Sequence, residues 1–255
     1  QQVKGAVLYN SGNCTMVNST IKDSFVTRAL FNTLFGVVYN EGNLKAIGCI
    51  FTNNGGVKDS SIPVYKGTVN IYNVGEIDIS YSAFLNNKAL PESYSDFFAD
   101  GGKNIYLDNN WWGSNEKPVN KSNVNKVESW LMLVGSPEYS ALDINGSTDI
   151  SAIWKSSSGK PININLFPVF DVSFNTWVNG TPQTITKTLF GGSATINYNW
   201  TQKKGSYDVS ISLGDFTQKV LVDVGKLVSN MTVSVNDIYY TENLVVNVTV
   251  SGIGS

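Results

Sequence analysis

The stretch LDNNWWGSN, residues 107–115, decides the fold because it closes a series of four similar segments. Aligned on their apolar positions, the segments start at Cys14, Leu44, Ile77 and Ile105, at intervals of 30, 33 and 28 residues. Apolar and polar residues alternate within each segment, which is typical of a β-strand. A repeat of this length with strand-like alternation predicts a solenoid.

Equivalent positions in the four segments form columns of matching chemistry. Stacked at the spacing of about 4.8 Å between strands, the apolar columns would fill a narrow core. These columns are Cys14, Leu44, Ile77 and Ile105; Met16, Ala46, Ile79 and Leu107; and Ile21, Phe51, Phe84 and Trp112. The sequence therefore predicts an all-β chain whose residues 1–127 form a parallel β-helix.

A polar column follows the apolar ones, formed by Ser24, Asn54, Asn87 and Asn115. Stacked amides at a bend can bind the backbone groups that the bend leaves unpaired, so we predict a structural asparagine column. Upstream, Tyr-Asn pairs at residues 9–10, 39–40 and 72–73 also repeat, each shortly before a glycine (Gly12, Gly42 and Gly75). We expect these glycines to adopt positive φ in turns.

Segment lengths vary at residues 55–67 and 88–98, and solenoids place such insertions in loops on one face, often the binding face. The second insertion contains ALPESYSDFF, residues 89–98, which combines aromatic and acidic side chains. A ligand-contacting loop and a cap over an exposed coil both remain open for it. The candidate binding residues are Glu92, Tyr94, Asp96, Phe97 and Phe98.

Composition excludes several classes of function. The chain has no histidine, which removes histidine-based triads and metal ligands, and a single arginine, Arg28. A net charge of −2 and a pI near 5.2 give no basic footprint for nucleic acid. No run of apolar residues is long enough to span a membrane. We expect no catalytic residues, no metal, no cofactor, no membrane contact within this chain, and a monomer.

The two cysteines, Cys14 and Cys49, fall in neighbouring repeats but five positions apart in the alignment. That offset corresponds to roughly 16 Å along a strand, whereas the Cα atoms of a disulfide lie within about 7 Å. We therefore predict two buried free thiols.

The second half has the pattern of a β-sandwich, with short alternating strands separated by turn sequences such as NGS, NGTP and KKG. We expect an Ig-like sandwich over residues 128–225 and the opening strands of a second, truncated Ig-like module over residues 226–255. Trp154, Trp177 and Trp200 are assigned to the core, with a sugar-stacking platform as the alternative. The expected strands cover residues 130–134, 149–154, 162–166, 170–174, 183–189, 194–200, 207–213 and 217–224.

The NNWWGS motif at the end of asparagine-rich coils, followed by Ig-like repeats, resembles the large adhesin-like surface proteins of methanogenic archaea. In that family a pectin-lyase-like, right-handed parallel β-helix precedes bacterial-Ig-like modules. The resemblance implies an extracellular protein, anchored to the cell surface outside this chain, that attaches to other microbial cells, host cells or their glycans. It supplies no catalytic or ligand residue that can be carried over. Because the chain starts within one repeat and stops within another motif, we expect a piece of a longer protein.

Two alternative functions accompany this interpretation, and one covalent modification is also considered. A structural spacer or surface-layer component would have no ligand of its own. A polysaccharide lyase would need clustered carboxylates and a basic residue, for which Asp78, Asp96, Asp100, Asp108 and Lys103 are the available groups. An intramolecular isopeptide bond in the second half would draw on Lys155, Lys187 or Lys219 with Asp171 or Asp208 as the acid.

Overall fold

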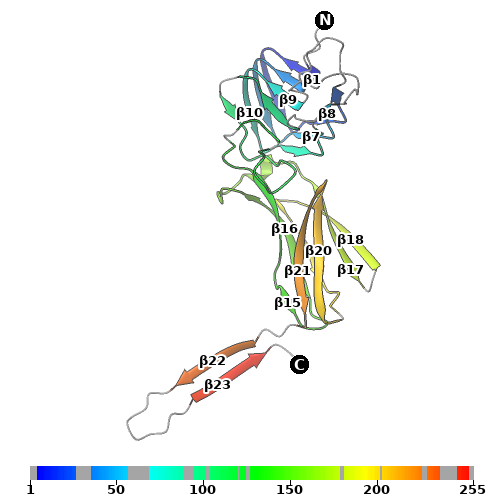
Figure 1. Ribbon diagram of the computed structural model, residues 1–255, viewed down its shortest axis with the longest axis vertical. Helices are drawn as coiled ribbons and strands as arrows, with labels where there is room; N and C mark the ends of the chain where they lie inside the picture. Colours follow the sequence, from blue (N-terminus) through cyan, green and yellow to red (C-terminus); the bar gives the residue numbers. More distant parts are fainter. Residues whose placement is uncertain are drawn as a thin grey trace.

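The chain is described from a computed structural model (Figure 1). The described residues are 5–26, 36–56, 69–88, 95–101, 104–119, 121–124, 127–178, 181–201, 203–225, 229–235 and 246–252. They form strands joined by turns, with one short 3-10 helix, η1 (Ile164–Leu166). The prediction of an all-β chain is confirmed.

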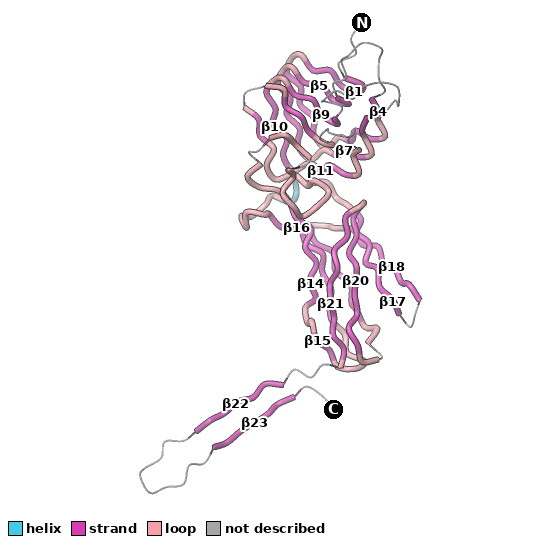
Figure 2. Tube along the Cα trace, viewed as in Figure 1, coloured by secondary structure: helices cyan, strands magenta, loops and turns pink. Residues whose placement is uncertain are grey.

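The first half, which we call the coil region (residues 5–127), consists of strands that pair in parallel, and Figure 2 draws these strands side by side at the N-terminal end of the molecule. Successive strands of the chain go to different sheets, and later circuits of the chain return to the same sheets. The first sheet contains β1 (Gly5–Asn10), β5 (Gly36–Asn40), β9 (Val69–Asn73) and β12 (Phe97–Ala99). The second sheet contains β2 (Asn13–Val17), β6 (Asn43–Ile47), β10 (Glu76–Ser80) and β13 (Ile105–Tyr106). The third sheet contains β3 (Thr20–Lys22), β7 (Ile50–Thr52) and β11 (Ala83–Leu85), and β4 (Phe25–Val26) pairs with β8 (Gly55–Gly56).

The predicted register of the repeats is confirmed. Cys14 pairs with Leu44, Leu44 with Ile77, and Ile77 with Ile105 in neighbouring strands. The aromatic column stacks face to face, with ring centroids 5.0 Å apart for Phe51–Phe84 and 4.5 Å apart for Phe84–Trp112. These columns make one buried core through the coil region, as the alternation of side chains across a strand requires.

The prediction that the repeated glycines adopt positive φ is wrong. Gly12, Gly42 and Gly75 do not have positive φ. A Cβ atom on Gly42 would lie 2.1 Å from the carbonyl oxygen of Gly12, and one on Gly75 would lie 2.1 Å from that of Gly42. Gly42 and Gly75 are needed because successive coils approach each other closely at this corner, whereas a Cβ atom on Gly12 would meet open space.

Other residues take the left-handed conformation, and these too are in register along the coils. One corner uses Asn18, Gly48, Tyr81 and Asn109, with φ between 47° and 66°; the other uses Asp23, Asn53 and Asn86, with φ near 52°. Asparagine and aspartate tolerate this region better than most residues, which accounts for the asparagine-rich sequence between strands.

The second half, which we call the two-sheet region (residues 128–225), is largely antiparallel. A three-stranded sheet contains β14 (Leu131–Pro137), β16 (Thr148–Ser156) and β19 (Ser193–Tyr198); a five-stranded sheet contains β15 (Ala141–Leu142), β21 (Phe216–Val224), β20 (Gly205–Leu213), β17 (Asp171–Val178) and β18 (Thr181–Thr188). Their facing side chains form a second buried core. The strand expected at residues 162–166 is wrong, since η1 occupies this segment.

Of the three tryptophans assigned to the core, Trp154 is buried and Trp200 is partly buried against it, but Trp177 is 64% exposed. Trp177 lies near the tip of the β17–β18 hairpin. Along β17 the side chains of Val172, Phe174 and Thr176 are buried, so the alternation of the strand places Trp177 on its outward face.

The two neighbouring tryptophans of the WWGS motif connect the regions by facing different cores. Trp112 belongs to the core of the coil region, whereas Trp111 belongs to the core of the two-sheet region, together with Ala83 and Leu85 from the coils. Trp111 packs edge-to-face against Trp154, with centroids 5.0 Å apart, and against Phe216, 5.2 Å apart. Apolar packing therefore crosses the boundary expected at residue 127.

The last two strands, β22 (Ser229–Val235) and β23 (Val246–Gly252), pair antiparallel with each other. They lie at the end of the two-sheet region opposite the coil region (Figure 1). Among the described residues, no helix is long and apolar enough to cross a membrane.

Candidate binding groove and buried polar columns

A ladder of buried asparagines follows the first sheet of the coil region. The Nδ2 of Asn10 donates to the Oδ1 of Asn40 (2.7 Å), and the Nδ2 of Asn40 donates to the Oδ1 of Asn73 (2.6 Å). The adjacent rings of Tyr9, Tyr39, Tyr72 and Phe98 stack in the same order, with centroid separations of 5.8, 5.5 and 5.4 Å. Because Tyr39 and Tyr72 are each only 6% exposed, this aromatic ladder offers little ring surface to a ligand.

The predicted asparagine column forms a second ladder. The Oδ1 of Asn54 accepts from the backbone N–H of Ser24 (3.1 Å), and the Oδ1 of Asn87 accepts from that of Asn54 (2.9 Å). The Nδ2 atoms of Asn54 and Asn87 donate to the carbonyl oxygens of Ile21 and Phe51, each at 2.9 Å. These side chains bind the backbone groups that the corner exposes, and their role is structural.

Asn115 does not continue the asparagine column, so this part of the prediction is wrong. Its Oδ1 accepts from the backbone N–H of Leu133 (2.8 Å) and its Nδ2 donates to the carbonyl oxygen of Leu133 (2.9 Å), while its own carbonyl accepts from the Nε1 of Trp130 (2.8 Å). Asn115 instead pairs with β14 and helps to join the two regions.

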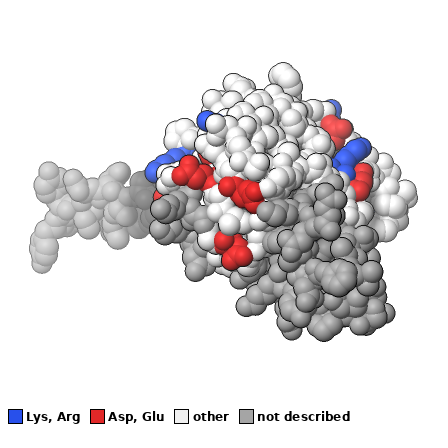
Figure 3. Space-filling model, turned by 90° about the horizontal axis from the view of Figure 1, so that it is seen from above, with Lys and Arg blue, Asp and Glu red and all other residues white. Residues whose placement is uncertain are grey.

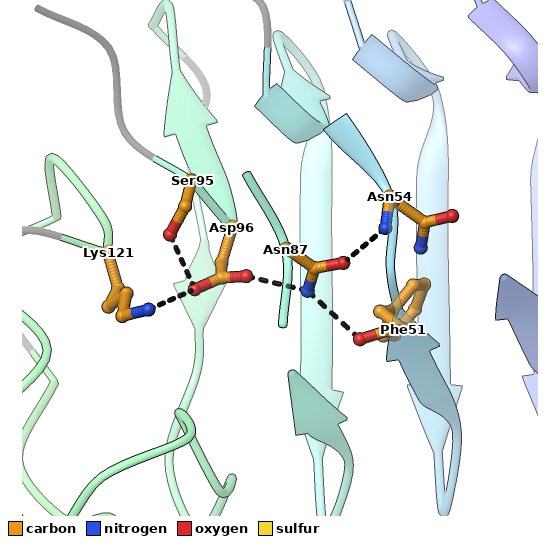
Figure 4. Close-up of polar contacts among 6 residues, drawn as sticks. All are labelled: Phe51, Asn54, Asn87, Ser95, Asp96 and Lys121. Atoms are coloured by element: carbon orange, nitrogen blue, oxygen red, sulfur yellow. Dashed lines mark hydrogen bonds and ion pairs between the residues drawn. The ribbon is translucent and has the colours of Figure 1, made fainter. Parts of the chain in front are cut away.

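Asp96 ends the second ladder as a buried carboxylate (Figure 4). Its Oδ1 accepts from the Nδ2 of Asn87 (2.7 Å), and its Oδ2 accepts from the hydroxyl of Ser95 (2.9 Å). The Nζ of Lys121 lies 3.9 Å from Oδ2. Asp96 is 1% exposed, and its contacts hold the start of β12 against the corner of the preceding coil.

Burial raises the pKa of Asp96 from 3.8 to about 6, although Lys121, Asn87 and Ser95 act in the opposite direction. The ammonium of Lys121 is the largest of these opposing effects, but it stands at 3.9 Å on a side chain that is 36% exposed and partly screened by water, so it does not offset the burial. Keeping the carboxyl group of Asp96 ionised at neutral pH therefore lowers the stability of the folded protein.

Asn70 lies in the same part of the core. Its backbone N–H donates to the carbonyl oxygen of Ser95, and Val37 occupies the equivalent place in β5. The side chain of Asn70 is fully buried, yet neither its Oδ1 nor its Nδ2 has a hydrogen-bond partner. Such a group costs free energy, since it has lost its hydration without replacement.

The predicted binding loop does not present the expected surface. Phe97 is fully buried in the core of the coil region, Asp96 is an internal acceptor, and Phe98 packs on Tyr72. These three residues form β12 and its approach, so hydrogen bonding to β9 turns them toward the protein. Glu92 and Tyr94 lie outside the described residues.

A groove of about 540 Å³ lies along β13, the outermost described strand of its sheet. The ring of Tyr106 is 59% exposed there. The lining residues are Asn104, Ile105, Tyr106, Leu107, Asp108, Val124 and Glu128. Apolar side chains, an exposed phenol, an amide and two carboxylates thus meet in one concave surface, the composition expected of a site for a small polar ligand.

Hydrogen bonds fix the polar groups of this groove. The Oδ1 of Asp108 accepts from the backbone N–H groups of Glu128 (2.8 Å) and Ser129 (2.9 Å), and none of the described hydrogen bonds uses its Oδ2. The Nδ2 of Asn104 donates to the Oε1 of Glu76 (2.9 Å). Sequence reasoning missed this site because residues 104–108 and 124–128 meet only through the fold; the one local signal was the outward position of Tyr106 in the last repeat.

The carboxylates considered for a lyase are engaged in separate places. Asp78 lies 3.9 Å from Lys45, Asp96 is buried, Asp100 accepts from the hydroxyl of Tyr72, and Asp108 binds backbone amides. In the described part of the chain, no group of three or more acidic or cysteine side chains could hold a metal ion.

The lysines considered for an isopeptide bond lie on the surface. Lys155 and Lys187 are exposed, and Lys219 forms a 2.9 Å ion pair with Asp208 in which the two side chains are 69% and 47% exposed. Asp171 is also exposed and accepts from the hydroxyl of Thr188 (2.6 Å). None of these described pairs has the buried acid that the reaction requires.

Both cysteines are free, as predicted, with Cys49 buried and Cys14 partly buried. Burial raises the pKa of the Cys49 thiol, which makes it a poor nucleophile. On the face seen in Figure 3, the coloured basic side chains lie apart among uncharged and acidic ones and form no continuous patch.

The sequence matches no protein-family model and no curated protein. Among solved structures, one similar chain is a β-glucosidase from Listeria innocua in complex with gluconolactone, at 15% identity and a TM-score of 0.26. The match covers 43% of this chain and spans 18% of the enzyme chain. A likeness of this size carries no argument about fold or activity.

Proposed function

We propose that this chain is part of a non-enzymatic, extracellular adhesin. In this proposal the coil region is a right-handed parallel β-helix that presents the binding surface, and the two-sheet region is an Ig-like stalk. Support comes from the parallel sheets with a repeat near 30 residues, followed by antiparallel sheets. The ligands would be glycans on the surface of other microbial or host cells.

The observation that carries the proposal is the groove along β13. Its exposed Tyr106 ring offers an apolar face, and Asn104, Asp108 and Glu128 offer polar groups around it, of which Asn104 and Asp108 are held by hydrogen bonds. Sugars have apolar faces bordered by hydroxyl groups, so this arrangement matches them in both respects. A single groove of this size would bind weakly, and many copies on a cell surface would supply avidity.

A structural spacer is the second candidate, and the junction between the two regions is consistent with it. Trp111, Asn115 and the backbone of Leu133 join the two regions through packing and hydrogen bonds. A stiff connection suits a rod that holds another domain away from the cell. It equally suits a presenting head, so the two candidates differ only in whether the chain itself binds a ligand.

The test is binding of the full chain to whole microbial cells and to a glycan array. Tyr106→Ala removes the exposed ring of the groove, and Tyr139→Ala is a matched control because Tyr139 is equally exposed (58%) in the two-sheet region. We expect Tyr106→Ala to weaken binding by at least about tenfold, which is about 1.4 kcal/mol, while Tyr139→Ala binds as the unmodified chain does. Absence of binding by the folded, unmodified chain would favour the spacer.

A further inference from the structure

The groove along β13 is lined by acidic side chains, and their negative charge limits the class of ligand that it can bind. Its described lining includes two carboxylates, Asp108 and Glu128, and no lysine or arginine. A third carboxylate, Glu76, accepts from Asn104 at the edge of the groove. The lining thus provides negative charge around an exposed aromatic ring.

The described lysines of the coil region near these strands have other acidic partners. Lys45 lies 3.9 Å from Asp78, and Lys121 lies 3.9 Å from Asp96. Lys103 and Lys126 are neighbours of the lining in sequence but lie outside the described residues. Binding of an anionic ligand would reveal a groove whose net charge is positive, and such a ligand is therefore included in the test.

Asp108 is well placed to bind a cation. Its Oδ1 is fixed by two backbone N–H groups at 2.8 and 2.9 Å, which orients the carboxylate without neutralising its charge. A charge-assisted hydrogen bond from a cation to a carboxylate oriented in this way is about twice as strong as a hydrogen bond between neutral groups. Glu128 is exposed beside it and adds to the attraction.

We propose that the groove binds a cationic amino sugar. The ring of Tyr106 packs on the apolar face of the sugar, and the protonated amine approaches the Oδ2 of Asp108 and the carboxylate of Glu128. This inference rests on the proposed glycan-binding function and specifies its ligand. It predicts preference for glucosamine oligomers over their neutral N-acetylated forms, and rejection of galacturonate oligomers.

The experiment measures binding of these three oligomers to the full chain by titration calorimetry at pH 6, at low and at physiological salt. Asp108→Asn retains an oxygen for the two backbone N–H groups and removes only the charge. Glu128→Gln removes the second charge, and Asp149→Asn is the control because Asp149 is an exposed carboxylate of the two-sheet region, outside the groove lining.

We expect glucosamine oligomers to bind at least about tenfold more tightly than N-acetylated ones, with the advantage reduced by salt and by Asp108→Asn or Glu128→Gln but not by Asp149→Asn. Equal binding of both forms, sensitive to Tyr106→Ala but not to Asp108→Asn, would overturn the amino-sugar assignment and leave glycan binding in place. Tighter binding of galacturonate would also overturn it. Failure of every glycan to bind would reject the proposed function itself.

Discussion

Replacing Trp111 by alanine should uncouple the two regions of the molecule, because this side chain fills the core that they share. Trp111 is fully buried and pairs through its backbone with Ala83 of the last complete coil. Its ring contacts Trp154 and Phe216, both in the two-sheet region. Its neighbour Trp112 is equally buried but stacks on Phe84 within the coil region, and Trp112→Ala is therefore the matched control.

The expected magnitude follows from burial. Truncation of a fully buried tryptophan costs about 3–5 kcal/mol, since it removes apolar contact and leaves a cavity. The two edge-to-face contacts account for about 0.5–1.5 kcal/mol each within that total. We expect Trp111→Ala to lower the stability of the two-sheet region by this amount, and Trp112→Ala to lower that of the coil region instead.

Hydrogen exchange read by mass spectrometry separates the two effects, because it reports opening free energies segment by segment. For Trp111→Ala, a loss of about 3 kcal/mol means exchange more than about a hundredfold faster in β14 and β16. For Trp112→Ala, the acceleration should appear in β7 and β11. Acceleration of the same segments by both variants, or less than about tenfold in β14 and β16 for Trp111→Ala, would refute a division of labour between the two tryptophans.

Three further predictions concern the coil region. Folding raises the pKa of Asp96 from 3.8 to about 6, so its contribution to stability is full below about pH 3.8 and is lost as the pH rises to about 6. The stability lost over this range is about 3 kcal/mol. Urea unfolding across pH 4–7 should show that Asp96→Asn removes this pH dependence, whereas Asp78→Asn keeps it. Asn70→Val should raise the free energy of unfolding by about 1–3 kcal/mol by removing an unpartnered buried amide; a loss of stability would show that the amide has a partner, such as a buried water. Gly42→Ala should destabilise by several kcal/mol (~3), since its Cβ would clash with the Gly12 carbonyl, whereas Gly12→Ala, with open space around it, should melt within about 2 °C of the unmodified chain.

The register of the coils could be predicted from sequence because one spacing, near 30 residues, brings matching side chains together in every column. Phe51, Phe84 and Trp112 stack as their alignment requires. The same alignment misplaced Asn115, since it cannot show where stacking stops and the next set of sheets begins. It also identified the glycine column correctly while giving the wrong cause, because close contact between coils is a property of the assembled corner.

The candidate site was less predictable. Asp96 and Phe97 have the composition of a binding loop, yet their position beside β9 buries them. The groove requires Tyr106 and Glu128 to meet, and no local pattern contains both. Trp177 was assigned to the core on residue type alone, although the alternation of side chains along β17 places it on the outward face.

The central claim, that the coil region binds glycans through the groove along β13, is tested most directly by hydrogen exchange of the full chain with and without a glycan that it binds. Slower exchange confined to residues 104–108 and the adjoining residues 127–129 is the predicted result. Slower exchange confined to the two-sheet region, or no change at saturating glycan, would contradict it.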